Sequence, residues 1–161
     1  MLVGVLSDSH DNLDQTEKAR ELFQTRQVSA VIHCGDFITP IVFDILAKLP
    51  VAFIGVFGNN DYKEALSARS RFQIKEEPYR FELAGRKIFI CHHRRYVEQL
   101  DESDYEIDLV LYGETHEPEI RRKGKCLIVN PGETCGWVTG TSTAAIVNLE
   151  TLEAEIIRLD V

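Results

Sequence analysis

The stretch Val3-Gly4-Val5-Leu6-Ser7-Asp8-Ser9-His10 decides how the rest of the chain is interpreted. Its apolar run predicts a short buried strand over residues 2–6, and the run stops abruptly at Asp8 and His10. Open α/β sheets bind their ligands at the carboxyl ends of the strands, so these two side chains stand where a metal site is expected. A single strand end of this kind is also compatible with an ordinary turn before a helix. The interpretation therefore depends on the residues at the ends of the other strands.

The first half of the chain alternates predicted strands with predicted helices. A helix over about 12–27 begins with Asn12 as its cap, and a second helix starts at Thr39-Pro40. The strands around them cover about 30–33 and 51–57, and both are almost continuously apolar. Continuous hydrophobicity indicates parallel strands that are covered on both faces.

The second half is predicted to contain mostly strands joined by tight turns. Glycine-containing turns at 84–86 and 123–125 each separate two apolar segments, as in a hairpin. A short helical piece comes after residue 95 and runs to about 100. The expected strands cover about 79–83, 87–91, 108–112, 120–122, 126–129, 143–149 and 154–159. With no linker or repeat, the pattern predicts one α/β domain over residues 1–161, with two packed sheets flanked by helices.

Composition and charge narrow the class of protein. The chain has 161 residues, of which 44% are hydrophobic and 27% charged, as in an ordinary globular domain. A formal net charge of −8 disfavours nucleic acid or an anionic membrane surface as the main partner. No apolar run approaches the length of a membrane span. The four cysteines lack a C-x-x-C pair and no secretory leader precedes the first strand, which predicts reduced thiols and a cytoplasmic protein. The oligomeric state stays open, a homo-oligomer included.

Metal-ligand side chains stand at the ends of five of the predicted strands. Each group is separated from the next by about one strand and its return element, so all of them can gather at one edge of the fold. Carboxylate, imidazole and amide oxygen donors suit borderline-to-hard divalent metals. There are more donors than one ion needs, and two ions about 4 Å apart with a shared carboxylate would use them. The candidate ligands are Asp8, His10, Asp36, Asn59, His92, Glu114 and His116.

In this order, the motifs D-x-H, G-D, G-N-x-D, a strand-end His and G-x-T-H resemble the calcineurin-like metallophosphoesterases. The N-P-G-E motif at 130–133 and the G-N-N-D box at 58–61 are similar to the small bacterial and archaeal phosphodiesterases of that superfamily. The resemblance implies a four-layered α/β sandwich with two mixed sheets. It also implies hydrolysis of a small phosphoester, most often a phosphodiester, by in-line attack of a hydroxide that bridges two metal ions.

The resemblance also implies a role for each ligand. Asp8, His10, Asp36 and His116 would hold the first metal, and Asp36 would bridge to the second. Asn59, His92 and Glu114 would hold the second metal.

Position 114 departs from the family pattern, because the family's G-H-T-H is here Gly113-Glu114-Thr115-His116. An anionic oxygen replaces a neutral imidazole, which predicts a harder second site. Such a site favours Mn²⁺, Fe²⁺ or Mg²⁺ over Ni²⁺ and Zn²⁺.

A second departure lies after the strand over 87–91, where the family's T-H-G-H is replaced by Cys91-His92-His93-Arg94. His92 continues the strand end, although a shift of one residue would make His93 the ligand. Arg94 is either a positive group that contacts the substrate phosphate or the solvated start of a helix.

Asn60 stands where many larger members of the superfamily carry a histidine near the leaving group. An amide cannot donate a proton as a general acid, so Asn60 predicts a preference for good leaving groups. The alternative to an enzyme is a catalytically weakened member that acts as a protein-interaction scaffold, as the retromer subunit of this fold does.

Overall fold

The computed structural model describes residues 1–68, 72–101 and 106–160. Its elements in chain order are β1 (Leu2–Leu6), α1 (Leu13–Thr25), β2 (Ala30–His33), α2 (Ile41–Leu46), β3 (Ala52–Val56), α3 (Lys63–Ser67), β4 (Gln73–Lys75), β5 (Tyr79–Leu83), β6 (Arg86–Ile90), α4 (Arg94–Glu98), β7 (Leu109–Leu111), β8 (Glu119–Lys123), β9 (Cys126–Asn130), β10 (Thr143–Asn148) and β11 (Glu153–Arg158). No helix in these ranges has the length and apolar composition needed to cross a membrane.

The strands form two mixed sheets. The first has the order β11-β10-β1-β2-β3-β4, in which β1 to β4 run parallel and β10 pairs antiparallel with both β1 and β11. The second has the order β5-β6-β7-β9-β8, with parallel central strands and one antiparallel strand at each edge. The prediction of an α/β fold with two mixed sheets is confirmed.

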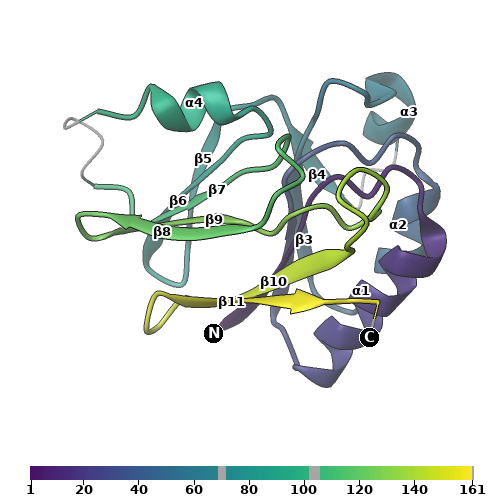
Figure 1. Ribbon diagram of the computed structural model, residues 1–161, viewed down its shortest axis with the longest axis horizontal. Helices are drawn as coiled ribbons and strands as arrows, with labels where there is room; N and C mark the ends of the chain where they lie inside the picture. Colours follow the sequence, from purple (N-terminus) through teal and green to yellow (C-terminus); the bar gives the residue numbers. More distant parts are fainter. Residues whose placement is uncertain (69–71, 102–105, 161) are drawn as a thin grey trace.

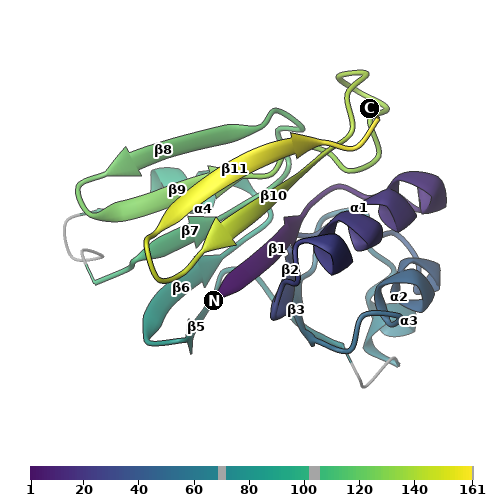
Figure 2. The same cartoon turned by 90° about the horizontal axis from the view of Figure 1, so that it is seen from below.

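Three hydrophobic clusters hold these layers together. The central cluster lies between the sheets and combines Val5 and Ile90 with residues of neighbouring strands. The helices α1 and α2 pack on the other face of the first sheet through Phe23 and Phe43, and α4 packs on the outer face of the second sheet through Val97. Figures 1 and 2 show the resulting order of helices, sheet, sheet and helix. It is the four-layered sandwich that the sequence resemblance implies.

Two short elements lie outside the sequence prediction, α3 and the strand β4. The segment Gln73-Ile74-Lys75 has one apolar residue, and it becomes a strand because it pairs in parallel with the edge of β3. The helix α1 matches its prediction more closely, since the Asn12 side chain accepts a hydrogen bond from the Gln15 N–H at 3.3 Å. The predicted start of the second helix is displaced by one residue, because Pro40 occupies the cap position before Ile41.

The carboxyl ends of β1, β2, β3, β6 and β7 share one edge of the two sheets. Backbone hydrogen bonds join the loops there, from Asp8 N–H to the Gly35 carbonyl at 3.0 Å and from Gly113 N–H to the His92 carbonyl at 3.1 Å. The loops after these strands therefore converge, although they are far apart in the sequence.

Candidate metal centre

Six of the seven predicted ligands meet at this edge. The carboxylate of Asp36 lies between two imidazoles, with its Oδ2 atom 3.4 Å from His10 Nε2 and 3.6 Å from His92 Nε2. Asp8 Oδ1 lies 3.5 Å from His116 Nε2 and 3.8 Å from His10 Nε2. Two sets of donor atoms result, Asp8 with His10 and His116 and Asp8 with Asp36 and His92, and within each set the atoms lie within 4.8 Å of one another. These distances leave room for ions between the donors.

Two buried atoms of these ligands have no hydrogen-bond partner among the described residues, Asp8 Oδ1 and His10 Nε2. Burial of an unpaired carboxylate oxygen costs free energy unless another group compensates it. The neighbouring carboxylates of Asp8 and Asp36 also raise the pKa of the His10 imidazole, which reflects a negative local field. A bound cation would satisfy the unpaired atoms and neutralise this field, so the residues fit a metal.

The imidazole of His92 is oriented for ligation. Its Nδ1 lies 2.9 Å from the carbonyl oxygen of Cys34, which can only accept, so Nδ1 is the donor. In the neutral ring, Nε2 then directs its lone pair at the Asn59 Oδ1 atom, 3.1 Å away, and at Asp36. Acceptor atoms that face one another in this way can all bind a cation that lies between them. His93 lies elsewhere, because its backbone N–H and its ring nitrogen Nδ1 both donate to Glu77.

Glu133 holds His116 in the same way, and it is a site residue that sequence reasoning missed. His116 Nδ1 donates to Glu133 Oε2 at 2.8 Å, which leaves Nε2 free to face Asp8. The same carboxylate accepts hydrogen bonds from Val138 N–H at 3.0 Å and from Thr139 N–H at 2.5 Å. Burial alone would raise the pKa of Glu133, but the hydrogen bonds from His116 and Thr139 outweigh it and lower this pKa to about 2. The N-P-G-E motif was the available signal.

Two glycines permit the close approach of the loops. A Cβ atom on Gly58 would lie 2.1 Å from Asp36 Oδ1, and one on Gly113 would lie 2.0 Å from Ser7 Oγ. Neither space admits a side chain. These glycines let the loops after β3 and β7 close onto the loops that carry the aspartates.

The chain also matches a known protein family. Residues 1–152 match the family model of the calcineurin-like phosphoesterase superfamily domain. The chain belongs to the calcineurin-like phosphoesterase superfamily. A phosphodiesterase from Methanocaldococcus jannaschii is 36% identical over 166 residues, which cover 99% of this chain and 100% of the relative.

Solved structures agree with this assignment. The structure of an archaeal phosphodiesterase superposes with a TM-score of 0.89 and 34% identity, covering 98% of this chain and 99% of the other. Vps29 from Entamoeba histolytica, solved in complex with Zn²⁺, has a TM-score of 0.71 and 17% identity, covering 99% of this chain and 100% of Vps29. At that identity, the likeness to Vps29 concerns the fold alone.

The three remaining predicted residues of this phosphoesterase make contacts of different kinds. Asn60 donates from its side-chain Nδ2 to Asp36 Oδ2 at 2.7 Å and from its backbone N–H to Asp36 Oδ1 at 3.0 Å. Glu114 is exposed and accepts a hydrogen bond from the Arg94 N–H at 2.7 Å, at the start of α4. Among the described residues, neither of the two donor sets that contain Asp8 includes Glu114. The guanidinium of Arg94 pairs with Glu98 Oε1 at 2.9 Å on the exposed side of α4.

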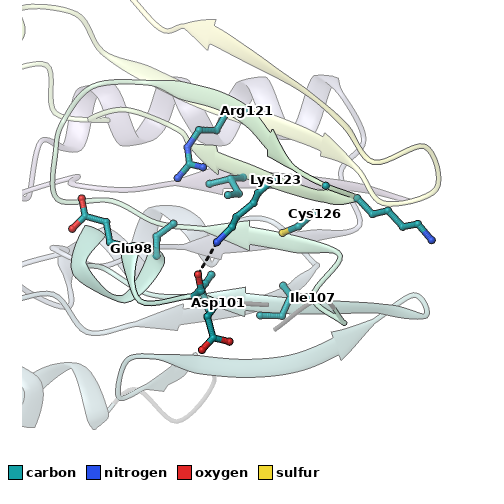
Figure 3. Close-up of a pocket in the computed structure, with 11 residues that line it drawn as sticks. Glu98, Asp101, Ile107, Arg121, Lys123 and Cys126 are labelled. Atoms are coloured by element: carbon teal, nitrogen blue, oxygen red, sulfur yellow. Dashed lines mark hydrogen bonds between the residues drawn. The ribbon is translucent and has the colours of Figure 1, made fainter. Parts of the chain in front are cut away.

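Two hollows flank α4 in this phosphoesterase, and only one adjoins the ligands. A cleft of about 780 Å³ includes Asn59 and Asp61 in its lining. The other hollow, of about 560 Å³, lies between α4 and the β8–β9 hairpin, and none of the predicted ligands lines it. Figure 3 shows Lys123 crossing this hollow to the carbonyl of Leu100, a hydrogen bond of 2.7 Å. Of the two, the cleft is therefore the hollow that adjoins a predicted ligand.

Proposed function

We propose that this chain is a metal-dependent phosphodiesterase that uses two divalent ions. The observation that carries the proposal is the position of Asp36, whose Oδ2 atom lies between His10 and His92 at 3.4 and 3.6 Å. A carboxylate in that position can bridge two ions. The phosphodiesterase from M. jannaschii, aligned over its whole length, supports the choice of reaction.

The ligands divide between the two sites. Asp8, His10, Asp36 and His116 would hold the first ion, and Asp36 would be shared with the second. Asn59 and His92 would hold the second ion, with Glu114 as the residue that completes it. Glu114 would have to give up its hydrogen bond to Arg94 N–H or bind through its other oxygen. Because Glu114 is a hard donor, we propose Mn²⁺ as the preferred metal, ahead of Ni²⁺ and Zn²⁺.

When bound, the ions lower the pKa of water and neutralise charge on the phosphate oxygens. The protein side chains hold this geometry. Asn60 fixes Asp36 through two hydrogen bonds, and Asp61 accepts hydrogen bonds from Ile38 N–H at 2.8 Å and Gly58 N–H at 2.7 Å. The loops after β2 and β3 are thereby locked together. In the hydrolysis, water forms a new P–O bond, one ester P–O bond breaks, and a phosphomonoester and an alcohol or phenol result.

The direct test is hydrolysis of bis-p-nitrophenyl phosphate with Mn²⁺, compared with the variant Asp36→Asn. We expect the wild type to release p-nitrophenolate and the variant to lose at least about a hundredfold in kcat/KM, because one bridging charge is removed. Asp160→Asn is the matched control, since Asp160 is exposed near the end of the described chain. Equal activity in wild type and Asp36→Asn would refute the enzymatic proposal.

The engagement of Asn60 with Asp36 adds a prediction about the leaving group. Its side-chain Nδ2 already donates to Asp36 Oδ2, and an amide supplies no acidic proton to a departing alkoxide. We expect aryl phosphodiesters to be hydrolysed much faster than dialkyl phosphodiesters, by at least about a hundredfold. Comparable rates for bis-p-nitrophenyl phosphate and a dialkyl ester would contradict this role of Asn60.

We also propose a cytoplasmic location. All four cysteines are free thiols, and three of them are buried. Unpaired cysteines in a folded domain are typical of reducing compartments. Expression with fractionation would test this location.

A further inference from the structure

The cleft of about 780 Å³ continues directly from the metal centre toward α3 and α4. Asn59 joins the two, because it lines the cleft while its Oδ1 atom lies 3.1 Å from His92 Nε2. The walls come from the loop after β3, from α3, from the segment before β5 and from α4. A phosphodiester whose phosphate lay between the ligands would therefore extend one of its two ester groups into this cleft.

Most acidic side chains of the cleft are already engaged. Asp61 accepts three backbone hydrogen bonds, and Glu77 accepts hydrogen bonds from the backbone N–H groups of His92 and His93. Glu76 pairs with Lys63 at 2.6 Å. The hydrogen bonds and the ion pair therefore reduce the repulsion that these carboxylates, and the attraction that Lys63, would otherwise exert on a phosphoester.

Aromatic rings and one arginine remain as binding groups. Tyr62 is 65% exposed at the start of α3, and Tyr96 lines the cleft from α4. The guanidinium of Arg95 lies 5.0 Å from the centre of the Tyr96 ring. Among the described residues, no carboxylate lies within ion-pair distance of Arg95, whereas the neighbouring Arg94 is paired with Glu98. A guanidinium has five N–H donors, so the interaction of Arg95 with the Tyr96 side chain leaves others for a ligand.

We propose that this cleft binds an uncharged aromatic ester group of the substrate, such as an aryl ring or a nucleobase. The group would stack on Tyr62 and Tyr96, and Arg95 would donate hydrogen bonds to its oxygen atoms. A second phosphate is a poorer fit, because Arg95 is the one lining cation without a carboxylate partner in the described ranges and the carboxylate of Glu64 lines the same cleft. This inference rests on the proposed phosphodiesterase function and specifies the class of its substrate.

The test uses substrates that share one leaving group and differ only in the other ester group. Methyl, phenyl and thymidine 5′-p-nitrophenyl phosphate all release p-nitrophenolate, and division of each kcat/KM by the uncatalysed rate of the same ester isolates the effect of the enzyme on the group that stays. We expect the phenyl and thymidine esters to exceed the methyl ester by about tenfold or more, mainly through a lower KM, because stacking is worth about that factor per ring.

Variants assign the preference to the named side chains. Tyr62→Ala and Tyr96→Ala should reduce the thymidine-to-methyl ratio to near one, while Tyr96→Phe retains the ring and should keep most of it. Arg95→Gln should lower the ratio for thymidine more than for phenyl, since a phenyl group offers no acceptor. Arg94→Gln tests the neighbouring arginine in the same way. The assignment to Arg95 would be overturned if the thymidine-to-methyl ratio fell in Arg94→Gln but persisted in Arg95→Gln.

The outcomes separate this inference from the function on which it rests. Metal-dependent hydrolysis with equal kcat/KM for all three esters would overturn the aromatic cleft and leave the phosphodiesterase intact. If none of the esters is hydrolysed, the proposed function fails, and calorimetry with Mn²⁺ then tests the cleft by itself. Thymidine 5′-monophosphate should bind at least about tenfold more tightly than methyl phosphate, and this difference should disappear in Tyr62→Ala and Tyr96→Ala. Equal binding of the two phosphates would overturn the inference.

Discussion

Replacement of Glu133 by glutamine probes the support of the first metal site without touching a ligand. The carboxylate has no exposed surface, and its Oε2 atom accepts the His116 Nδ1 proton at 2.8 Å. Its Oε1 atom faces Thr139 N–H at 2.5 Å. In Glu133→Gln, the amide nitrogen must occupy one of these positions. If the amide nitrogen faces His116, it forces the ring proton onto Nε2, the atom directed at Asp8. If the amide nitrogen faces Thr139, it places a donor against the backbone N–H of that residue.

These contacts set the expected magnitude. Loss of a carboxylate that orients a ligating histidine typically lowers metal affinity about 10- to 100-fold, or about 1.4–2.8 kcal/mol. The metal-free protein should also lose about 2–4 kcal/mol of stability, because hydrogen bonds to a charged acceptor contribute about 1.5–3 kcal/mol each and at least one donor is left unpaired. Glu133→Ala should lose more on both measures, since it leaves every donor unpaired.

Calorimetric titration of metal-free protein with Mn²⁺ measures the affinity, and urea unfolding in a chelator measures the stability. Glu117→Gln is the matched control, because Glu117 is exposed and lies one residue from His116. The reasoning fails if Glu133→Gln binds Mn²⁺ within twofold of wild type. It also fails if Glu117→Gln is affected as strongly.

Single contacts elsewhere in the fold support three more predictions. Gly58→Ala places a Cβ 2.1 Å from Asp36 Oδ1 and 2.5 Å from the Asp36 backbone nitrogen, so the loop must shift and Mn²⁺-dependent hydrolysis should fall about a hundredfold. Glu114→His should raise Ni²⁺-supported activity relative to Mn²⁺-supported activity, and an unchanged ratio would exclude Glu114 from the second site. Burial, with the hydrogen bond to Glu119, raises the pKa of Tyr112 from 10.0 to about 12. The neutral phenol therefore stabilises the fold below pH 10, and the stability difference between wild type and Tyr112→Phe should shrink between pH 10 and 12.

The sequence predicts most strands here because each is a short apolar run that ends at a glycine or a charged residue. It fails for β4, which has one apolar residue, Ile74, and exists through its pairing with β3. A local sequence pattern also does not predict the order of the strands in a sheet. The strand β10 inserts beside β1, with Val5 opposite Ala145, and nothing near either residue encodes that partner.

For the site, the sequence indicates which residues are candidate ligands but not how they are supported. His92 and His93 are adjacent and chemically identical, and the fold separates them because Glu77 binds the ring of His93 while Cys34 orients that of His92. Both partners are distant in the chain. Glu133 was not among the candidates either, because the N-P-G-E motif indicates a turn but not that its glutamate faces His116.

Backbone conformation gives an independent reason to regard the ligand loops as functional. Asp8, His10, Asp36, Glu114 and His116 all have left-handed φ angles, between 43° and 68°. Such conformations favour glycine, and each costs a side chain of this kind on the order of 1 kcal/mol. Glycine would adopt these φ angles without this cost, so the side chains at these positions are explained by what they contact or bind. Glu114 shares the left-handed φ of the other four, although its side chain contacts the start of α4. The ligand role proposed for Glu114 therefore requires its carboxylate to leave the Arg94 N–H or to bind through its other oxygen.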